Sequence, residues 1–266
     1  MDLELKGKTA IVTGGSRGIG KAVAREFARE GMDVAIVARG KEALDEAASE
    51  LAKETGRRIL PIVADTRDDA SVQAMVRQAV QAMGKVDVLV NNAARPAGQG
   101  PVPKLEEITN EMFWEDMNTK VMGYLRCARE VAPLMKKQKW GRIINISGLG
   151  ARTSGSTIGS MRNIAVSAMT KNLADELGPF GITVTVVHPG LTWTERIPGL
   201  VAERAKEQGV PEAAVERQIQ EGNSIKRLID ATEVAYVVAF LASPKGVSIN
   251  GDAVVCGGGV GKAIYY

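Results

Sequence analysis

Residues 9–20 read TAIVTGGSRGIG, and the chain continues without a break as KAVAREFAREG. The β-branched run before Gly14 predicts a strand, and the apolar spacing after residue 19 predicts an amphipathic helix. The glycines between them leave room for backbone N–H groups and the positive helix end to approach a diphosphate. We therefore expect a dinucleotide to bind here, the alternative being a plain turn between strand and helix. The candidate contacts are Gly14, Ser16, Arg17, Gly18, Ile19 and Gly20.

Length and composition favour one folded domain. With 266 residues and 45% hydrophobic residues, the chain can bury one large core, so we expect a single α/β domain over residues 1–266. No long apolar run and no signal-peptide core are present, which predicts a cytoplasmic protein without membrane contact. The net charge of +3 is too small to predict nucleic-acid binding. One histidine and two separated cysteines, Cys127 and Cys256, predict no metal site.

Strand and helix patterns alternate along the chain. Buried-type strands are predicted at 33–38, 58–64, 86–90, 142–147, 182–188 and 252–256, in addition to the first. Helical patterns lie between them, at 41–55, 71–83, 110–137, 156–177 and 232–242. Such alternation indicates right-handed crossovers and a parallel sheet covered by helices on both faces.

The pattern loosens between about residues 190 and 227, where Pro and Gly interrupt short charged helical pieces. We expect this segment to form a lid over a ligand. It carries the apolar residues Trp193, Ile197, Leu200 and Val201. They favour an apolar ligand, although packing within the segment explains them equally well.

Several motifs in order resemble one family over nearly the whole chain. They are TGGSRGIG at 13–20, Asp65, NNAA at 91–94, GRIINIS at 141–147 and HPG at 188–190. The sequence resembles the short-chain dehydrogenases/reductases and is similar in layout to 3-oxoacyl-carrier-protein reductases. The resemblance implies a Rossmann-type, doubly wound parallel sheet of about seven strands. It also implies a homodimer or homotetramer, and cofactor contacts by Asp65, Asn91, Ala93, Pro189, Gly190 and Thr194.

The charges near the predicted adenosine end favour NADP(H). A carboxylate at the end of the second strand holds a free ribose 2′-hydroxyl, whereas a 2′-phosphate needs a cation. Here that strand ends at Arg39, and Arg17 lies in the glycine turn. The alternative is that both arginines are solvated surface residues.

The catalytic positions that the resemblance implies are not filled as usual. The family uses a tyrosine and a lysine on one helical face, Y-x-x-x-K, with a serine and an asparagine beside them. This chain has no tyrosine between Tyr124 and Tyr236, and Lys171 is the only lysine between Lys139 and Lys206. Counting from the flanking motifs places Gly159 at the tyrosine, Asn163 at the lysine, Gly148 at the serine and Lys120 at the asparagine. We therefore expect an atypical active site that lacks the tetrad.

The candidate catalytic residues are Lys120, Ser147 and Asn163. Burial would lower the pKa of Lys120 and let it exchange a proton near neutral pH. The alternative is a lysine that extends from its helix to water. Ser156 and Ser160 are better explained as caps of the following helix, and His188 as a structural histidine.

Three functions remain open. The first is an NADP(H)-dependent oxidoreductase that acts on a carbonyl or an alcohol through a replacement acid, with an apolar substrate favoured by the lid residues. The second is a non-redox lyase, isomerase or hydrolase on the same fold. The third is a cofactor-binding protein without catalysis.

Overall fold

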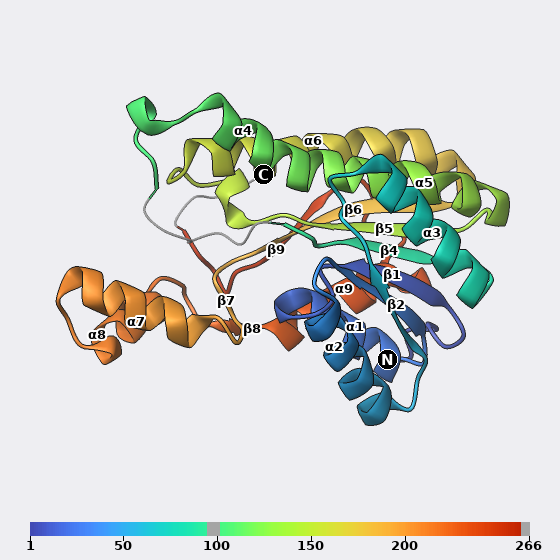
Figure 1. The fold of residues 1–266 in the computed structure, drawn as a ribbon, viewed down its shortest axis with the longest axis horizontal. Helices are drawn as coiled ribbons and strands as arrows, with labels where there is room; N and C mark the ends of the chain where they lie inside the picture. The colour runs from blue at the N-terminus through green and yellow to red at the C-terminus, as the bar shows by residue number, and fades with distance from the viewer. Residues whose placement is uncertain (95–101, 262–266) are drawn as a thin grey trace.

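The computed structural model describes residues 1–94 and 102–261 of the domain predicted over 1–266. A seven-stranded parallel sheet has the order β3-β2-β1-β4-β5-β6-β9 (Figure 1). The order reverses between β1 and β4, which confirms the predicted doubly wound arrangement. The strands are β1 (Thr9–Thr13), β2 (Asp33–Ala38), β3 (Ile59–Val63), β4 (Val88–Asn91), β5 (Gly141–Ile146), β6 (Ile182–Pro189) and β9 (Ala253–Cys256).

Helices cover both faces of this sheet and form one α/β domain with it. The first face carries α1 (Gly18–Arg29), α2 (Lys41–Thr55) and α9 (Ala231–Ala242). The second face carries α3 (Asp69–Met83), α5 (Gly123–Gln138) and α6 (Thr157–Leu177). Short 3₁₀ turns complete the connections, at Leu105–Glu107, Leu149–Ala151, Gly178–Phe180 and Pro244–Gly246.

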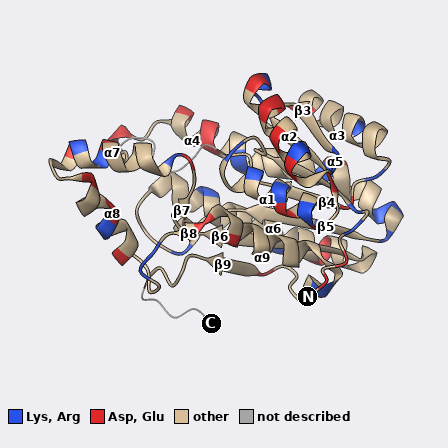
Figure 2. Ribbon diagram, turned by 90° about the horizontal axis from the view of Figure 1, so that it is seen from below, with Lys and Arg blue, Asp and Glu red and all other residues tan. Residues whose placement is uncertain are grey.

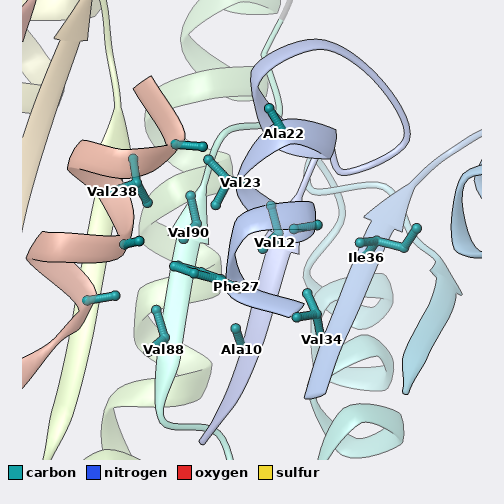
Figure 3. Packing of buried hydrophobic residues seen from close by; sticks show 14 of the residues in the cluster. Ala10, Val12, Ala22, Val23, Phe27, Val34, Ile36, Val88, Val90 and Val238 are labelled. Carbon is teal, nitrogen blue, oxygen red and sulfur yellow. The ribbon is translucent and has the colours of Figure 1, made fainter. Parts of the chain in front are cut away.

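The core beneath α1 fixes the position of the glycine turn. Phe27 is fully buried and packs from α1 onto strands β1 and β4, near Ala10, Val88 and Val90 (Figure 3). The apolar face predicted after residue 19 thus anchors the helix to the sheet. Burying a side chain of this size contributes about 1.5–3 kcal/mol.

Surface charges on this face are paired between helices rather than gathered in one patch. Lys21 and Arg25 of α1 bind Glu50 of α2, and Arg25 also binds Glu54. Figure 2 shows basic and acidic positions interspersed over the molecule. In the described part of the chain, no helix has both the length and the apolar character needed to cross a membrane.

The helix predicted over 110–137 differs from the expectation in its middle. It is built from α4 (Asn110–Met117), a π-helical turn η2 (Asn118–Met122) and α5. The Gly123 N–H donates to the Asn118 carbonyl five residues before it, and the Arg126 guanidinium donates to the same oxygen. Lys120 lies in this turn and is buried, with 4% of its surface exposed. Apolar periodicity does not reveal such an insertion.

The segment expected as a lid contains α7 (Ile197–Gln208) and α8 (Glu212–Glu221), which extend away from the sheet (Figure 1). A two-stranded parallel ladder, which the sequence did not predict, joins its two ends: β7 (Thr192–Trp193) pairs with β8 (Ile229–Asp230). The apolar residues of the segment pack on one another, and Ile197 and Val201 are buried. Packing within the segment therefore accounts for much of its apolar character.

Candidate active site

The glycine turn leaves no room for a side chain at Gly20. A Cβ atom added at Gly20 would lie 2.2 Å from the Gly14 carbonyl oxygen and 2.5 Å from Asn92 Nδ2. Gly14 has φ of 66°, a left-handed conformation that glycine adopts without strain. The turn therefore brings its backbone close to the carboxyl end of β4.

The first N–H groups of α1 are not capped by the residue that precedes the helix. Arg17 has an extended backbone and no side-chain capping bond. Instead, the Gly18 N–H donates to Oε2 of Glu195, at 3.3 Å. Glu195 belongs to the segment before α7 and was not among the predicted site residues. This contact shows that an N–H group at this helix end donates to an anionic oxygen.

At the predicted adenosine end, basic side chains lie near the Asp65 carboxylate. Arg39 follows β2 and is exposed, as is Arg17 in the turn. Arg67 binds Asp65 at 2.7 Å, and this bond, with the nearby charge of Arg39, lowers the pKa of Asp65. Arg67 was missed in the sequence, where it has no motif of its own.

The two asparagines of NNAA face different ways. Asn91 is fully buried, and its Nδ2 donates to Asn145 Oδ1 and to the Tyr124 carbonyl. Its side chain therefore joins β4 to β5 and α5 inside the fold. Asn92 instead donates to the carbonyls of Thr13 and Gly14, at 3.1 and 3.2 Å.

The remaining predicted cofactor residues lie around the same edge. Ala93 N–H donates to the Thr13 hydroxyl, and Ser16 and Ile19 are partly exposed in the turn. Pro189 ends β6, and Gly190 N–H donates to the Cys256 carbonyl. A Cβ added at Gly18 would lie 3.6 Å from Thr194 Cγ2, so Thr194 lies over the turn.

The three candidate catalytic residues lie together. Lys120 Nζ donates to the Ser147 carbonyl and to Asn163 Oδ1, both at 3.0 Å. Ser147 Oγ donates to the same amide oxygen, at 3.2 Å. Burial, reinforced by the charge of Arg162 and opposed by that of Asp116, lowers the pKa of Lys120 to about 7. The ammonium is thus enclosed rather than extended to water.

Two glycines make room for the Asn163 side chain. A Cβ added at Gly148 or Gly150 would lie 3.4 or 2.9 Å from Asn163 Nδ2. A side chain at either position would press against the amide that holds Lys120. The two glycines of the sequence GLG at 148–150 therefore leave space for the Asn163 side chain.

A buried ion pair adjoins this cluster. Arg162 Nη1 donates to Asp116 Oδ1 at 2.6 Å, and both side chains are largely buried. Neither residue was predicted. The signal available in the sequence was that Asp116 lies one helical turn before Lys120 and that Arg162 precedes Asn163.

His188 is held in a structural network. Its Nδ1 accepts from the Gly148 N–H, which leaves Nε2 to donate to Ser167 Oγ at 3.3 Å. Burial lowers the pKa of His188 to about 4, so the ring is neutral at neutral pH. The expectation of a structural histidine fits these contacts.

Other polar groups nearby have structural partners. Ser156 accepts from Gly159 N–H and caps α6, as expected, whereas Ser160 donates to the Thr153 carbonyl instead. The Tyr124 hydroxyl donates to the Ile146 carbonyl at 2.8 Å, and burial raises its pKa. Tyr124 is therefore not available as an acid at this site.

Comparisons with known proteins agree with this fold. The family model described as enoyl-(acyl carrier protein) reductase matches residues 14–261. The chain is 34% identical to the uncharacterized oxidoreductase YxjF of Bacillus subtilis, over 96% of this chain and 98% of that protein. It is 33% identical to the 3-oxoacyl-[acyl-carrier-protein] reductase FabG of Staphylococcus aureus, over 95% and 98% respectively.

A solved structure matches almost the full length. The L-sorbose reductase of Gluconobacter frateurii, complexed with NADPH and L-sorbose, superposes with a TM-score of 0.93 at 31% identity. The match covers 99% of this chain and 100% of that one. Together with the glycine turn and the sheet order, these matches show that the chain belongs to the short-chain dehydrogenase/reductase family of oxidoreductases.

Proposed function

We propose that the protein is an NADP(H)-dependent oxidoreductase that interconverts a carbonyl and an alcohol, with Lys120 exchanging the proton. The observation that carries this proposal is the enclosed Lys120 ammonium, held by Ser147 and Asn163 beside the cofactor edge of the sheet. A lysine whose pKa is about 7 is poised to give or take a proton under neutral conditions.

The residues present fit a dinucleotide. The close glycine turn and the α1 N-terminus provide N–H donors for a diphosphate, and the Gly18 N–H already binds a carboxylate oxygen. We assign Arg39 and Arg17, which are both exposed, to a ribose 2′-phosphate, and the absence of a carboxylate at the end of β2 supports this assignment. The NADPH complex of the related L-sorbose reductase supports this choice of cofactor.

We further propose that the site works without the usual tetrad. The family resemblance implies an asparagine at position 120 and a lysine at position 163. In this chain the two residue types are exchanged, as Lys120 and Asn163. Because the two side chains meet at 3.0 Å, the exchange keeps an ammonium in the same cluster. The exchange supplies no counterpart of the family's tyrosine, since Gly159 has no side chain and the Tyr124 hydroxyl donates to the Ile146 carbonyl.

The chemistry of the chain's residues follows from these contacts. NADPH, when bound, supplies a hydride to the carbonyl carbon of the substrate. An ammonium has three N–H groups, and Lys120 uses two of them to bind Ser147 and Asn163. The third would give its proton to the carbonyl oxygen, forming the alcohol and leaving a neutral amine. Ser147 and Asn163 would position that amine.

The segment 190–227 is proposed as the substrate lid. Its ends are joined by the β7–β8 ladder, and Glu195 contacts the glycine turn, so the segment is tied to the cofactor edge. We also propose a homodimer or homotetramer through the two long helices α5 and α6. Exposed apolar side chains on this side, at Met122, Met161 and Ile164, support it.

The test has two steps. NADPH and NADH are first titrated against the protein, and tighter binding of NADPH is expected. NADPH oxidation is then followed with a panel of ketones, quinones and enones. Turnover of one of them supports the proposal. Tight NADPH binding without any turnover would contradict it, and conversion of a substrate without cofactor would favour a non-redox enzyme.

A further inference from the structure

A buried arginine beside the Lys120 cluster has no part in the proton transfer proposed above. Arg162 lies on α6, and 9% of its side chain is exposed. Its Nη1 binds Asp116, whereas its buried Nε has no hydrogen-bond partner within residues 1–94 and 102–261. An unpaired buried donor costs free energy, so a ligand that pairs with Arg162 Nε would recover that cost.

The guanidinium of Arg162 lies next to the glycine where the family resemblance places a tyrosine. A Cβ added at Gly159 would be 4.0 Å from Arg162 Nη2. Helical side chains lean toward the N-terminus of their helix, which is why Arg162 reaches a residue three positions earlier. Because Gly159 has no side chain, the space beside Nη2 is not filled from that position.

Among the described residues of this cluster, Lys120 and Arg162 are cations that lie beside one carboxylate, Asp116. The Arg162 charge lowers the pKa of Lys120, whereas the Asp116 charge raises it. The two cations are both buried, and Asp116 is the carboxylate that binds one of them. A singly charged anion beside Arg162 would balance the second cation, and burying an unbalanced charge is costly.

We infer that Arg162 binds a carboxylate of the substrate, so that the protein acts on an oxo acid or the corresponding hydroxy acid. A planar guanidinium matches the two oxygens of a carboxylate and binds it with strong, charge-assisted hydrogen bonds. A doubly charged phosphate group would exceed the charge to be balanced. This inference rests on the proposed carbonyl–alcohol reaction and names the substrate class for it.

Calorimetric binding of pentanoate and pentanamide tests it without catalysis. The two probes differ in charge but not in chain length, and they are titrated into the full chain with and without saturating NADP⁺. We expect pentanoate to bind about 10- to 100-fold more tightly than pentanamide, the range of charge-assisted hydrogen bonds. Arg162→Met should abolish this preference, and Arg162→Lys should retain part of it.

Controls separate recognition from folding. Arg129→Met removes an arginine of α5 that binds Asp69 at the surface, and it should keep the preference. The double variant Asp116→Asn with Arg162→Gln leaves no buried carboxylate unpaired, and it should lose the preference while still binding NADP⁺. Equal binding of the two probes by the unaltered chain, or a carboxylate preference that survives in the double variant, would overturn the inference. Failure of the unaltered chain to bind NADP⁺ would overturn the proposed function instead.

Discussion

The Lys120 Nζ atom lies 3.0 Å from Asn163 Oδ1, although the two residues are 43 positions apart in the sequence. The contact joins the π-helical turn before α5 to the second turn of α6 and encloses an amine that is charged in water. The cost of that enclosure is what brings the pKa of Lys120 down to about 7. The lowered pKa of Lys120 therefore affects both the stability of the fold and the proposed proton transfer.

Lys120→Met should change how stability depends on pH. The unfolded chain holds the lysine proton up to about pH 10.5, whereas the folded protein releases it near pH 7. Folding therefore expels a proton between these values, and the stability of the unaltered chain should rise with pH across this window. Below about pH 7 the folded protein bears the full cost of the buried charge.

Thermal unfolding measured at about pH 6 and about pH 9 tests this expectation. The stability of Lys120→Met, compared with that of the unaltered chain, should be higher at the lower pH than at the higher pH. Lys53→Met, at an exposed position of α2, serves as the control and should show no such difference. A Lys120→Met effect that is the same at both pH values would show that the lysine is not buried as a titrating group.

Arg39→Asp should weaken NADPH binding by about 1–3 kcal/mol and leave NADH binding nearly unchanged, because it removes a charge-assisted contact to the 2′-phosphate. Fluorescence titration of both cofactors gives the comparison. Arg57→Asp changes an arginine that precedes β3 and binds Asp33, away from the cofactor edge, and controls for net charge. An equal loss for the two cofactors would mean that Arg39 does not read the phosphate.

Glu195→Gln should strengthen NADPH binding several-fold. The Glu195 carboxylate accepts from the Gly18 N–H, a donor that the cofactor diphosphate would use, and its charge would oppose the phosphates. Stopped-flow binding should show the gain chiefly in the association rate and more strongly at low salt. Glu203→Gln, on α7, is the matched control. Unchanged or weaker binding by Glu195→Gln would argue that this carboxylate does not compete.

Much of the fold was predictable because its signals are local. Alternating strand and helix patterns and the turn at Gly14–Gly20 specify the parallel sheet, and the ends of the observed strands lie within two residues of the predicted ones. The β7–β8 ladder was missed because two-residue strands carry no periodic pattern. The helix α3 begins at Asp69 rather than Ser71 because Asp68 caps it, accepting from Ser71 N–H.

The site was predictable in part. Motif spacing placed Lys120, Ser147 and Asn163 near one another, and the structure brings them into contact. Spacing did not reveal Arg162, Asp116 or Glu195, because their roles depend on contacts between distant segments and on burial. The direction of the Asn91 side chain was also hidden, since the residues at the end of a strand alternate between the two faces.

The most direct test of the central claim compares the unaltered chain with Lys120→Met in NADPH-dependent reduction of a carbonyl substrate. We expect the unaltered chain to turn over with a rate that changes near pH 7, and Lys120→Met to lose about 10²- to 10⁴-fold in rate while binding NADPH as before. Lys53→Met should behave as the unaltered chain does. A Lys120→Met protein that reduces the substrate as fast, with the same pH profile, would contradict the assignment of Lys120 as the proton donor.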